Sequence, residues 1–198
     1  MHSLKPALNA YTLCRLTFLA SPMKFKHVVI QSLAAVEPPI RVTSKEIEEK
    51  LKPTLDRLGI RDDLLEEVSG IGARRFWEKG TAPSDAATLA AEKALDESGI
   101  DRQKIGVIIN TSVCRDYLEP STACIVHGNL GLSENCLNFD VGNACLAFMN
   151  GMDIAARMIE RAEVEYALVV DGESSRPITE ATINRMLDPE VTEQQFRA

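Results

Sequence analysis

The stretch FDVGNACLAF, residues 139–148, decides the fold. Its first residues complete an apolar run and predict the end of a buried strand, Gly142 and Asn143 predict a tight bend, and Cys145 stands where a helix over 146–162 is expected to begin. Unpaired N–H groups and the positive end of the helix dipole favour a thiolate at such a place. Cys145 is therefore a candidate nucleophile for acyl transfer, which would hold the acyl group as a thioester. Inert packing, the usual role of a free cysteine, is the alternative.

Strands and helices alternate along the rest of the chain. Pro53 is expected to bend or divide the first helix. The order of the elements and their short links indicate an α/β fold with a central mixed sheet flanked by helices. Apolar runs predict buried strands at 25–35, 105–113, 136–142 and 166–173, and helical periodicity with capping residues predicts helices at 44–58, 84–98 and 121–131 besides that at 146–162.

The composition is that of an ordinary globular protein. Of the 198 residues, 45% are hydrophobic and 26% are charged, unlike a disordered or membrane-embedded chain. The formal net charge of -7 argues against nucleic acid or an anionic membrane as a partner, because binding to phosphates requires a surplus of Lys and Arg. No CxxC pair occurs, so we expect neither a disulfide framework nor a zinc site, and a reducing cytoplasm fits the cysteines Cys14, Cys114, Cys124, Cys136 and Cys145.

The ends of the sequence differ in character from its middle. Residues 1–22 are expected to be an extension ahead of a natural start at Met23. They resemble a poor signal peptide, because Arg15 interrupts an apolar run that is too short to span a membrane; export or organelle targeting is the alternative. One domain is expected over 23–176, and the polar helical segment 177–198 is expected to lead to a second half that the sequence does not include.

FDVGNACLAF resembles the active-site strand and nucleophile turn of the ketoacyl synthase III branch of the thiolase superfamily. The resemblance runs from about residue 24 to about 176 and implies a thiolase-like fold, of which this chain is the N-terminal half. It also implies that Cys145 is the acyl-accepting nucleophile. Other pieces of the family pattern occur in order: SGIGARRF (69–76), SDAATLAAEKALDESGI (84–100), TSV (111–113), PSTACIVHGNLGL (120–132) and YALVVDGESS (166–175).

Glu119 indicates a particular branch of that superfamily. It precedes Pro120 in CRDYLEPSTA (114–123), where typical ketoacyl synthase III chains carry an apolar or aromatic residue. This segment, together with NACLAFMNGMDIAARM (143–158), is similar to the olefin-biosynthesis condensing enzymes of OleA type, which join two fatty acyl-CoA molecules head to head. The resemblance implies that Glu119 reaches the active site of the other subunit of a homodimer and acts as a base, since a carboxylate in apolar surroundings is well suited to proton abstraction. A solvated loop glutamate is the alternative.

Arg74 and Arg75 are candidates for binding the acyl donor. Two aromatic residues follow them, and the group could hold the anionic phosphopantetheine or nucleotide part by charge and stacking; solvated surface charge is the alternative. Gly72 replaces the first arginine of the related pattern. The tryptophan and arginine that clamp the adenine of CoA in the family match Leu64 and Val68, so that clamp is absent.

The function that the resemblance implies is an acyltransferase acting on fatty acyl-CoA or acyl-ACP. Cys145 would take the acyl group of one thioester, and a second thioester, deprotonated at its α-carbon, would attack it to give a β-keto acid or thioester. No metal or redox cofactor is implied, since His127 and Cys124, one helical turn apart, do not make a metal site. The alternatives are a 3-oxoacyl-ACP synthase III that extends an acyl starter with malonyl-ACP in fatty acid biosynthesis, and a non-catalytic truncated subunit that only pairs with a complementary half. A cysteine hydrolase has the least support.

The catalytic histidine and asparagine of the family come from its second half, and this sequence has no matching positions. Claisen condensation needs donors preorganised where the oxyanion develops. We therefore expect the isolated chain to have little or no condensing activity.

Overall fold

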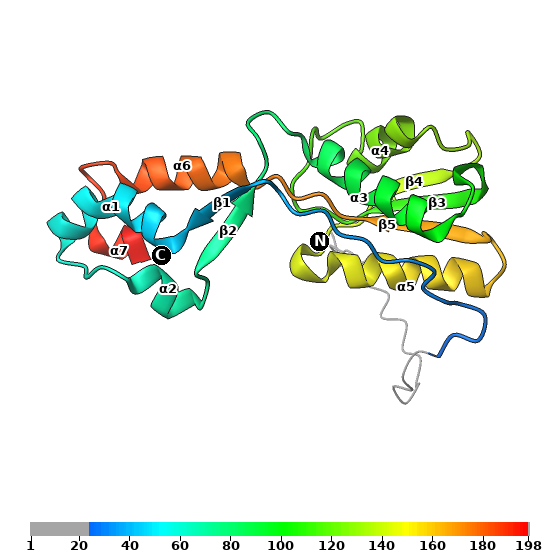
Figure 1. Cartoon of the computed structure of the whole chain (residues 1–198), viewed down its shortest axis with the longest axis horizontal. Coiled ribbons are helices and arrows are strands. Elements are labelled where there is room, and N and C mark those ends of the chain that lie inside the picture. The colour runs from blue at the N-terminus through cyan, green and yellow to red at the C-terminus, as the bar shows by residue number, and fades with distance from the viewer. Residues whose placement is uncertain (1–23, 198) are drawn as a thin grey trace, which may run out of the picture.

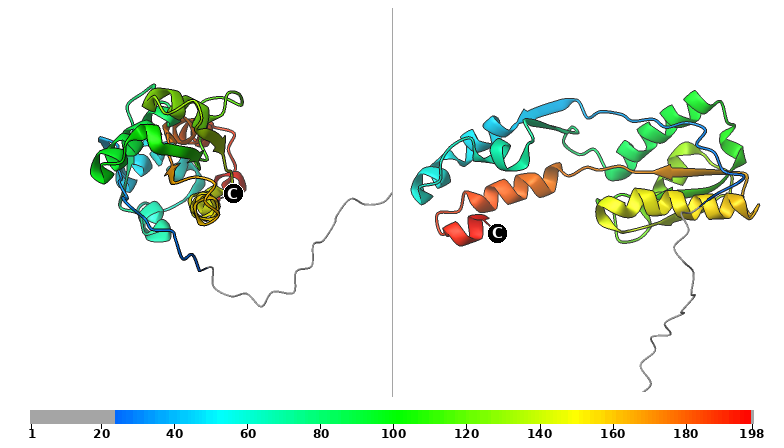
Figure 2. Two further views of the ribbon diagram at one scale, coloured as in Figure 1. Left: turned by 90° about the vertical axis from the view of Figure 1, so that its right-hand side faces the viewer. Right: turned by 90° about the horizontal axis from the view of Figure 1, so that it is seen from below.

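The computed structural model describes residues 24–197, which form two lobes (Figure 1). Extended segments join the two lobes. Figure 2 shows the lobes at opposite ends of an elongated molecule. The sheet lobe contains β3 (Ile105–Asn110), β4 (Leu137–Asp140), β5 (Tyr166–Val170), α3 (Pro83–Ser98), α4 (Thr122–Leu130) and α5 (Ala147–Glu160). The helical lobe contains β1 (Ile40–Thr43), β2 (Ala73–Phe76), α1 (Ser44–Leu58), α2 (Leu64–Ser69), α6 (Arg176–Met186) and α7 (Glu193–Arg197), and short 3-10 helices occur at Arg102–Lys104 and Ala144–Leu146.

The sheet lobe is a three-layer structure around three parallel strands in the order β4-β3-β5. The central strand is buried on both faces, as its continuous apolar run predicts: Val107, Ile108 and Ile109 are fully buried. Ile108 packs with apolar residues of α3 and α4, whereas Val107 and Ile109 pack with α5 on the other face. The predicted strands at 105–113, 136–142 and 166–173 and the helices between them are thus confirmed, with ends that differ by a few residues. The expected burial of 136–142 is wrong, because β4 is an edge strand and Leu137 is exposed.

The helical lobe is built on a capped amphipathic helix. Thr43 begins α1 with a reciprocal capping box: its hydroxyl accepts from the backbone N–H of Glu46, whose carboxylate accepts from the backbone N–H of Thr43. Pro53 does not divide α1, which runs without interruption to Leu58, so that part of the expectation is wrong. Burial of its apolar face against the rest of the lobe outweighs the backbone hydrogen bond that a proline removes.

The last helices return to α1. Thr54 Oγ1 donates to the carbonyl oxygen of Met186 at 2.9 Å, and Ile183, Met186 and Phe196 pack against the buried face of α1. The described part of the segment 177–198 contains α6 and α7, with a non-helical link between them, and its apolar residues complete the core of the helical lobe. That the segment leads to a second half stays a prediction.

The strand expected at 25–35 is wrong, because residues 24–39 form no strand. Their backbone is extended, but Val29, Ile30 and Leu33 are 79%, 68% and 76% exposed. Residues with high β propensity favour an extended backbone, yet a strand also needs a neighbour with which to pair. No strand of the described part of the chain takes that place.

Side chains hold this extended segment to both helical layers of the sheet lobe. Ser32 Oγ donates to the carbonyl oxygen of Ala94 in α3 at 2.8 Å. At the other layer, the Glu160 carboxylate at the end of α5 accepts from the backbone N–H groups of Lys26 and His27, each at 3.0 Å.

The expected single mixed sheet is instead two small sheets. The three strands of the sheet lobe are all parallel, and the antiparallel pairing occurs in the helical lobe between β1 and β2. Among the helices of residues 24–197, none is long and apolar enough to cross a membrane. The expected extension, residues 1–22, lies outside the described residues.

Candidate active site

Cys145 is exposed in the short 3-10 helix that immediately precedes α5. The strand β4 ends at Asp140, a bend follows, and the helix begins, as the sequence predicts. Ala144 has a φ of 44°, a left-handed conformation that costs a non-glycine residue about 1–2 kcal/mol. Such outliers concentrate at functional sites, where the surrounding structure holds them.

The close packing of α5 on the sheet fixes the position of this turn. Gly151 in α5 faces the sheet so closely that a Cβ atom there would lie 2.7 Å from Thr111 Cγ2 and 3.0 Å from Val169 Cγ1. At the start of the helix, Asn143 Nδ2 donates to Asn150 Oδ1 at 2.6 Å. Cys145 is therefore carried on a rigid element.

A polar network joins the carboxyl ends of the parallel strands. The carboxylate of Asp140 accepts from the backbone N–H of Ala123 at 2.8 Å, which caps α4, and from Asn110 Nδ2 at 3.2 Å. Ser112 Oγ donates to Asn110 Oδ1 and accepts from the backbone N–H of Gly172, both at 2.7 Å. The loops that follow β3, β4 and β5 are thereby held together.

An open hollow of about 270 Å³ lies at this edge of the sheet; its lining ends at Ala144, the residue before Cys145, and does not include Cys145 itself. The loop after β5 leads directly to α6, so the carboxyl ends of the parallel strands face the helical lobe (Figure 1). Ligands of open α/β sheets bind outside the carboxyl ends of the strands. The hollow is lined by Thr111, Ser112, Val113, Arg115, Gly142, Asn143 and Ala144.

A larger hollow, about 460 Å³, lies in the helical lobe between α1 and α6. Its lining includes Lys50, Lys79 and Glu180 and contains no cysteine, so this hollow offers no thiol that could hold an acyl group as a thioester.

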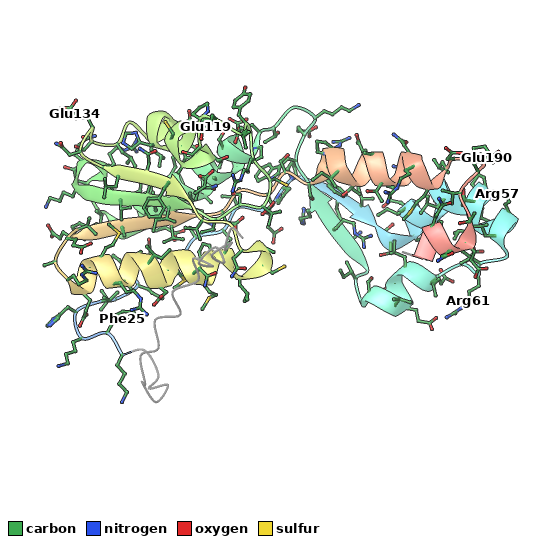
Figure 3. All side chains as sticks on the ribbon, turned by 180° about the vertical axis from the view of Figure 1, so that it is seen from behind. Phe25, Arg57, Arg61, Glu119, Glu134 and Glu190 are labelled. Carbon is green, nitrogen blue, oxygen red and sulfur yellow. The ribbon has the colours of Figure 1, made fainter. Side chains whose placement is uncertain are left out.

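Glu119 lies on the exposed loop between β3 and α4 (Figure 3). Its neighbours Tyr117 and Leu118 are 63% and 86% exposed. Glu119 is not among the residues that line the hollow beside Cys145. The lining includes neither Glu119 nor Cys145, and a role for Glu119 as base in the other subunit stays a prediction.

Arg74 and Arg75 lie on β2, in the helical lobe, and neither lines the hollow beside Cys145. Arg74 donates to Ser44 Oγ at 3.1 Å. Arg75 pairs with the Glu37 carboxylate at 3.1 Å and donates to the carbonyl oxygen of Pro38 at 3.2 Å. Both guanidinium groups thus hold parts of the chain together, and binding of the acyl donor stays a prediction.

The sequence patterns assign no role to Asp171 and Glu173, which follow β5. Burial, and secondarily the negative charge of Glu173, raises the pKa of Asp171. Burial and a hydrogen bond with Glu173 raise the pKa of the Cys114 thiol to about 11. Their position in the sequence could have identified them. Polar residues that directly follow one buried parallel strand lie at the same edge of the sheet as the polar residues that follow the neighbouring strands.

Metal-ligating side chains do not gather in the part of the chain that the structure describes: residues 24–197 contain no group of three or more His, Cys, Asp or Glu that could hold a metal ion. His127 Nε2 is 3.0 Å from the carbonyl oxygen of Ser133, an ordinary structural contact.

Comparison with known proteins shows what this chain is similar to. The family model of 3-oxoacyl-[acyl-carrier-protein (ACP)] synthase III matches residues 139–187. Acyl-CoA:acyl-CoA alkyltransferase of Xanthomonas campestris pv. campestris is 60% identical over 175 residues, which cover 88% of this chain and 52% of that protein. The protein of the same name from Shewanella oneidensis is 41% identical over 88% of this chain and 50% of its own length.

Solved structures give the same result. Cerulenin-bound Xanthomonas campestris OleA is 60% identical, with a TM-score of 0.85, over 87% of this chain and 50% of that one. Variants of the same protein that replace a glutamate by glutamine or a cysteine by alanine match equally well, and these two positions are 26 residues apart. The chain spans about half the length of the curated relatives it matches, namely their N-terminal half. Its fold is thiolase-like, as the sequence resemblance implies, and the curated relatives it is similar to are named acyl-CoA:acyl-CoA alkyltransferases.

Proposed function

We propose that this chain supplies the acyl-accepting half of an enzyme that condenses two fatty acyl-CoA molecules head to head. The observation that carries the proposal is the exposed position of Cys145 at the start of α5, beside the hollow at the carboxyl ends of the strands. A cysteine that only packs, such as Cys136, is buried instead. The name of the curated relatives supports acyl-CoA as the substrate class for both partners of the reaction.

The first step is acylation of Cys145. Its thiolate attacks the carbonyl carbon of an acyl-CoA, the carbon–sulfur bond to CoA breaks, and CoA leaves as a thiolate that takes up a proton. The acyl group is then held as a thioester on a turn that the packing of α5 keeps rigid.

The second step forms the carbon–carbon bond. A base removes a proton from the α-carbon of a second acyl-CoA, and the resulting carbanion attacks the carbonyl carbon of the thioester on Cys145. The cysteine leaves as a thiolate, and the product is a β-ketoacyl thioester, whose hydrolysis gives a β-keto acid. The reaction consumes no redox equivalent, and we propose that it uses no cofactor.

We propose Glu119 of a second subunit as the base. Its exposed loop, with Tyr117 and Leu118 beside it, is suited to contact another chain. Glu119 and Cys145 are 26 residues apart, the same spacing as the substituted glutamate and cysteine in the solved OleA variants. The proposal therefore includes a homodimer.

The first amides after Cys145, those of Leu146 and Ala147, are not free to act as donors for the oxyanion. The backbone N–H of Leu146 donates to the carbonyl oxygen of Asn143, and that of Ala147 to Ala144. Both groups are engaged and cannot also bind a developing oxyanion. We therefore expect this chain by itself to be acylated slowly and to form little condensation product.

Intact-protein mass spectrometry after incubation with a long-chain acyl-CoA tests the proposal. We expect one acyl group per chain, its loss in Cys145→Ser, and its retention in Cys124→Ser, which removes another exposed thiol. Absence of any adduct would instead favour a non-catalytic subunit that only pairs with a complementary half.

Product analysis distinguishes head-to-head condensation from the remaining alternative, a 3-oxoacyl-ACP synthase III. A chain complemented to activity should yield a long α-branched β-keto acid from acyl-CoA alone. Decarboxylative extension with malonyl-ACP would identify a 3-oxoacyl-ACP synthase III of fatty acid biosynthesis. Because the cysteines Cys114, Cys124, Cys136 and Cys145 are all free, we propose that the protein works in a reducing compartment, the cytoplasm.

A further inference from the structure

The loop that carries Glu119 leaves the sheet at Ser112. Up to that residue the chain is fixed by the strands: the backbone N–H of Thr111 donates to the carbonyl oxygen of Val170 at 2.8 Å, and Ser112 bonds to Asn110 in the network described above. The next residues line the hollow beside Cys145, and the loop then runs to Glu119 at the surface. Whatever holds residues 113–120 therefore sets where Glu119 lies.

Glu173 is the first anchor of this loop. Its Oε1 accepts from the backbone N–H of Val113 at 2.6 Å and its Oε2 from that of Cys114 at 3.1 Å. Both oxygens of one carboxylate are thus used on consecutive amides of a segment that lies 60 residues earlier in the chain. Hydrogen bonds to an ionised acceptor are stronger than those between neutral groups.

Asp116 is a second anchor, further along the same loop. Its carboxylate accepts from Ser84 Oγ at 2.6 Å and from Thr122 Oγ1 at 3.2 Å, so it binds the loop to the first turns of α3 and α4. Two carboxylates therefore hold the loop, one on each side of Arg115.

We propose that Glu173 is a positioning residue for the condensation step. By accepting hydrogen bonds from the backbone amides of Val113 and Cys114, it holds the Glu119 loop in the geometry that presents Glu119 to the active site of the other subunit. This rests on the proposed function only for the role of Glu119. The two hydrogen bonds from the Val113 and Cys114 amides to the Glu173 carboxylate, called the Glu173 clamp below, can be tested without substrate.

The chemistry of the clamp requires a carboxylate. In Glu173→Gln one of the two acceptor oxygens becomes an NH2 group, which cannot accept from a backbone N–H, so one of the two hydrogen bonds is lost. Glu173→Asp keeps both acceptors on a side chain shorter by one methylene and should restore part of the effect. Glu134→Gln is the matched control, because Glu134 is exposed and lies elsewhere on the sheet lobe (Figure 3).

Amide hydrogen exchange of the full chain, resolved to peptides, is the first measurement. We expect Glu173→Gln to speed exchange over residues 113–119 by about tenfold, Glu173→Asp to speed it less, and Glu134→Gln to leave it unchanged. The Cys114 thiol is a second reporter, since Glu173 contributes to its raised pKa. Its thiolate absorbance in the far ultraviolet should appear at lower pH in Glu173→Gln under conditions where circular dichroism shows the chain folded, since burial is the larger cause of the raised pKa and unfolding would lower it too.

The functional measurement compares the two steps. In a chain complemented to activity, Glu173→Gln should leave acylation of Cys145 within about twofold of wild type, while exchange of the α-protons of bound acyl-CoA with D2O should fall by about tenfold. Unchanged amide hydrogen exchange over residues 113–119 would overturn the clamp. Equal losses in the rate of Cys145 acylation and in the rate of α-proton exchange would overturn the specific role of Glu173 in the condensation step. A wild-type chain that never exchanges α-protons would count against the proposed function and not against the clamp, which the amide exchange decides.

Discussion

Gly151→Ala tests whether the packing of α5 on the sheet fixes the Cys145 turn. The new Cβ atom would lie 2.7 Å from Thr111 Cγ2 and 3.0 Å from Val169 Cγ1. Both neighbours are β-branched residues at or next to the strands, so neither can move aside by rotating a flexible end. Overpacking of this kind costs about 1–3 kcal/mol, and the better helix propensity of alanine returns about 1 kcal/mol. We therefore expect a net loss of about 1 kcal/mol of unfolding free energy.

Gly128→Ala is the matched control for this substitution. Gly128 also lies within a helix, α4, but a Cβ atom there would meet nothing within 4 Å. Only the propensity gain remains, so this variant should be more stable by about 1 kcal/mol. The two variants should differ by about 2 kcal/mol, roughly 4–8 °C in Tm for a chain of this size.

Thermal and urea unfolding of both variants provide the measurement, and the acylation rate of Cys145 provides a functional readout. Gly151→Ala should slow acylation, because relief of the contact displaces the start of α5, whereas Gly128→Ala should not. Equal stabilisation by the two alanines would refute the reasoning, since it would mean that α5 does not press on Thr111 and Val169.

Two further predictions concern pH. Hydrogen bonds from Thr43 lower the pKa of Glu46, so the capping box should contribute stability above the unfolded pKa of Glu46, near 4.5, and lose it as the pH falls through the lowered value. Thr43→Ala should cost about 1 kcal/mol at neutral pH and should only weaken this acid-dependent loss in urea titrations, because the backbone N–H of residue 43 still donates to Glu46. Glu46→Gln should abolish the loss, and an unaltered pH profile in that variant would contradict the capping box. Burial raises the pKa of Asp171, so its charge should destabilise the fold at neutral pH and the chain should gain stability as acidification protonates it. Asp171→Asn should raise the unfolding free energy at neutral pH and abolish that gain, and a less stable variant would argue against the assignment.

Much of the sheet lobe could be predicted because its signals are local. The continuous apolar run of β3 and the terminal glycine of α3, Gly99 with a φ of 66°, each specify an element within a few residues. The bend before Cys145 was equally predictable, since a strand, a glycine and a helix follow one another directly in the sequence.

The features that were mispredicted or missed depend on distant partners. The segment 25–35 has the composition of a strand, but pairing depends on a neighbour that local sequence does not specify. The roles of Arg74 and Arg75 depend on contacts with Ser44 and Glu37, 30 and 38 residues away. No periodicity relates these pairs of residues, so only the folded chain shows them.

The Glu173 clamp is of the same kind. It joins residues 60 positions apart. The donors are backbone amides, which every residue except proline has, so the residue types in the sequence do not indicate the contact. Only the rule that loops at the carboxyl ends of parallel strands meet at one edge indicates where such contacts occur.

The most direct test of the central claim is to find which cysteine carries the acyl group. After brief exposure to a long-chain acyl-CoA, proteolysis and peptide mass spectrometry locate the thioester among Cys114, Cys124, Cys136 and Cys145. We predict that the peptide containing Cys145 carries it and that hydroxylamine removes it. Equal labelling of Cys124, which is also exposed among the cysteines of residues 24–197, would contradict the assignment of Cys145 as the nucleophile.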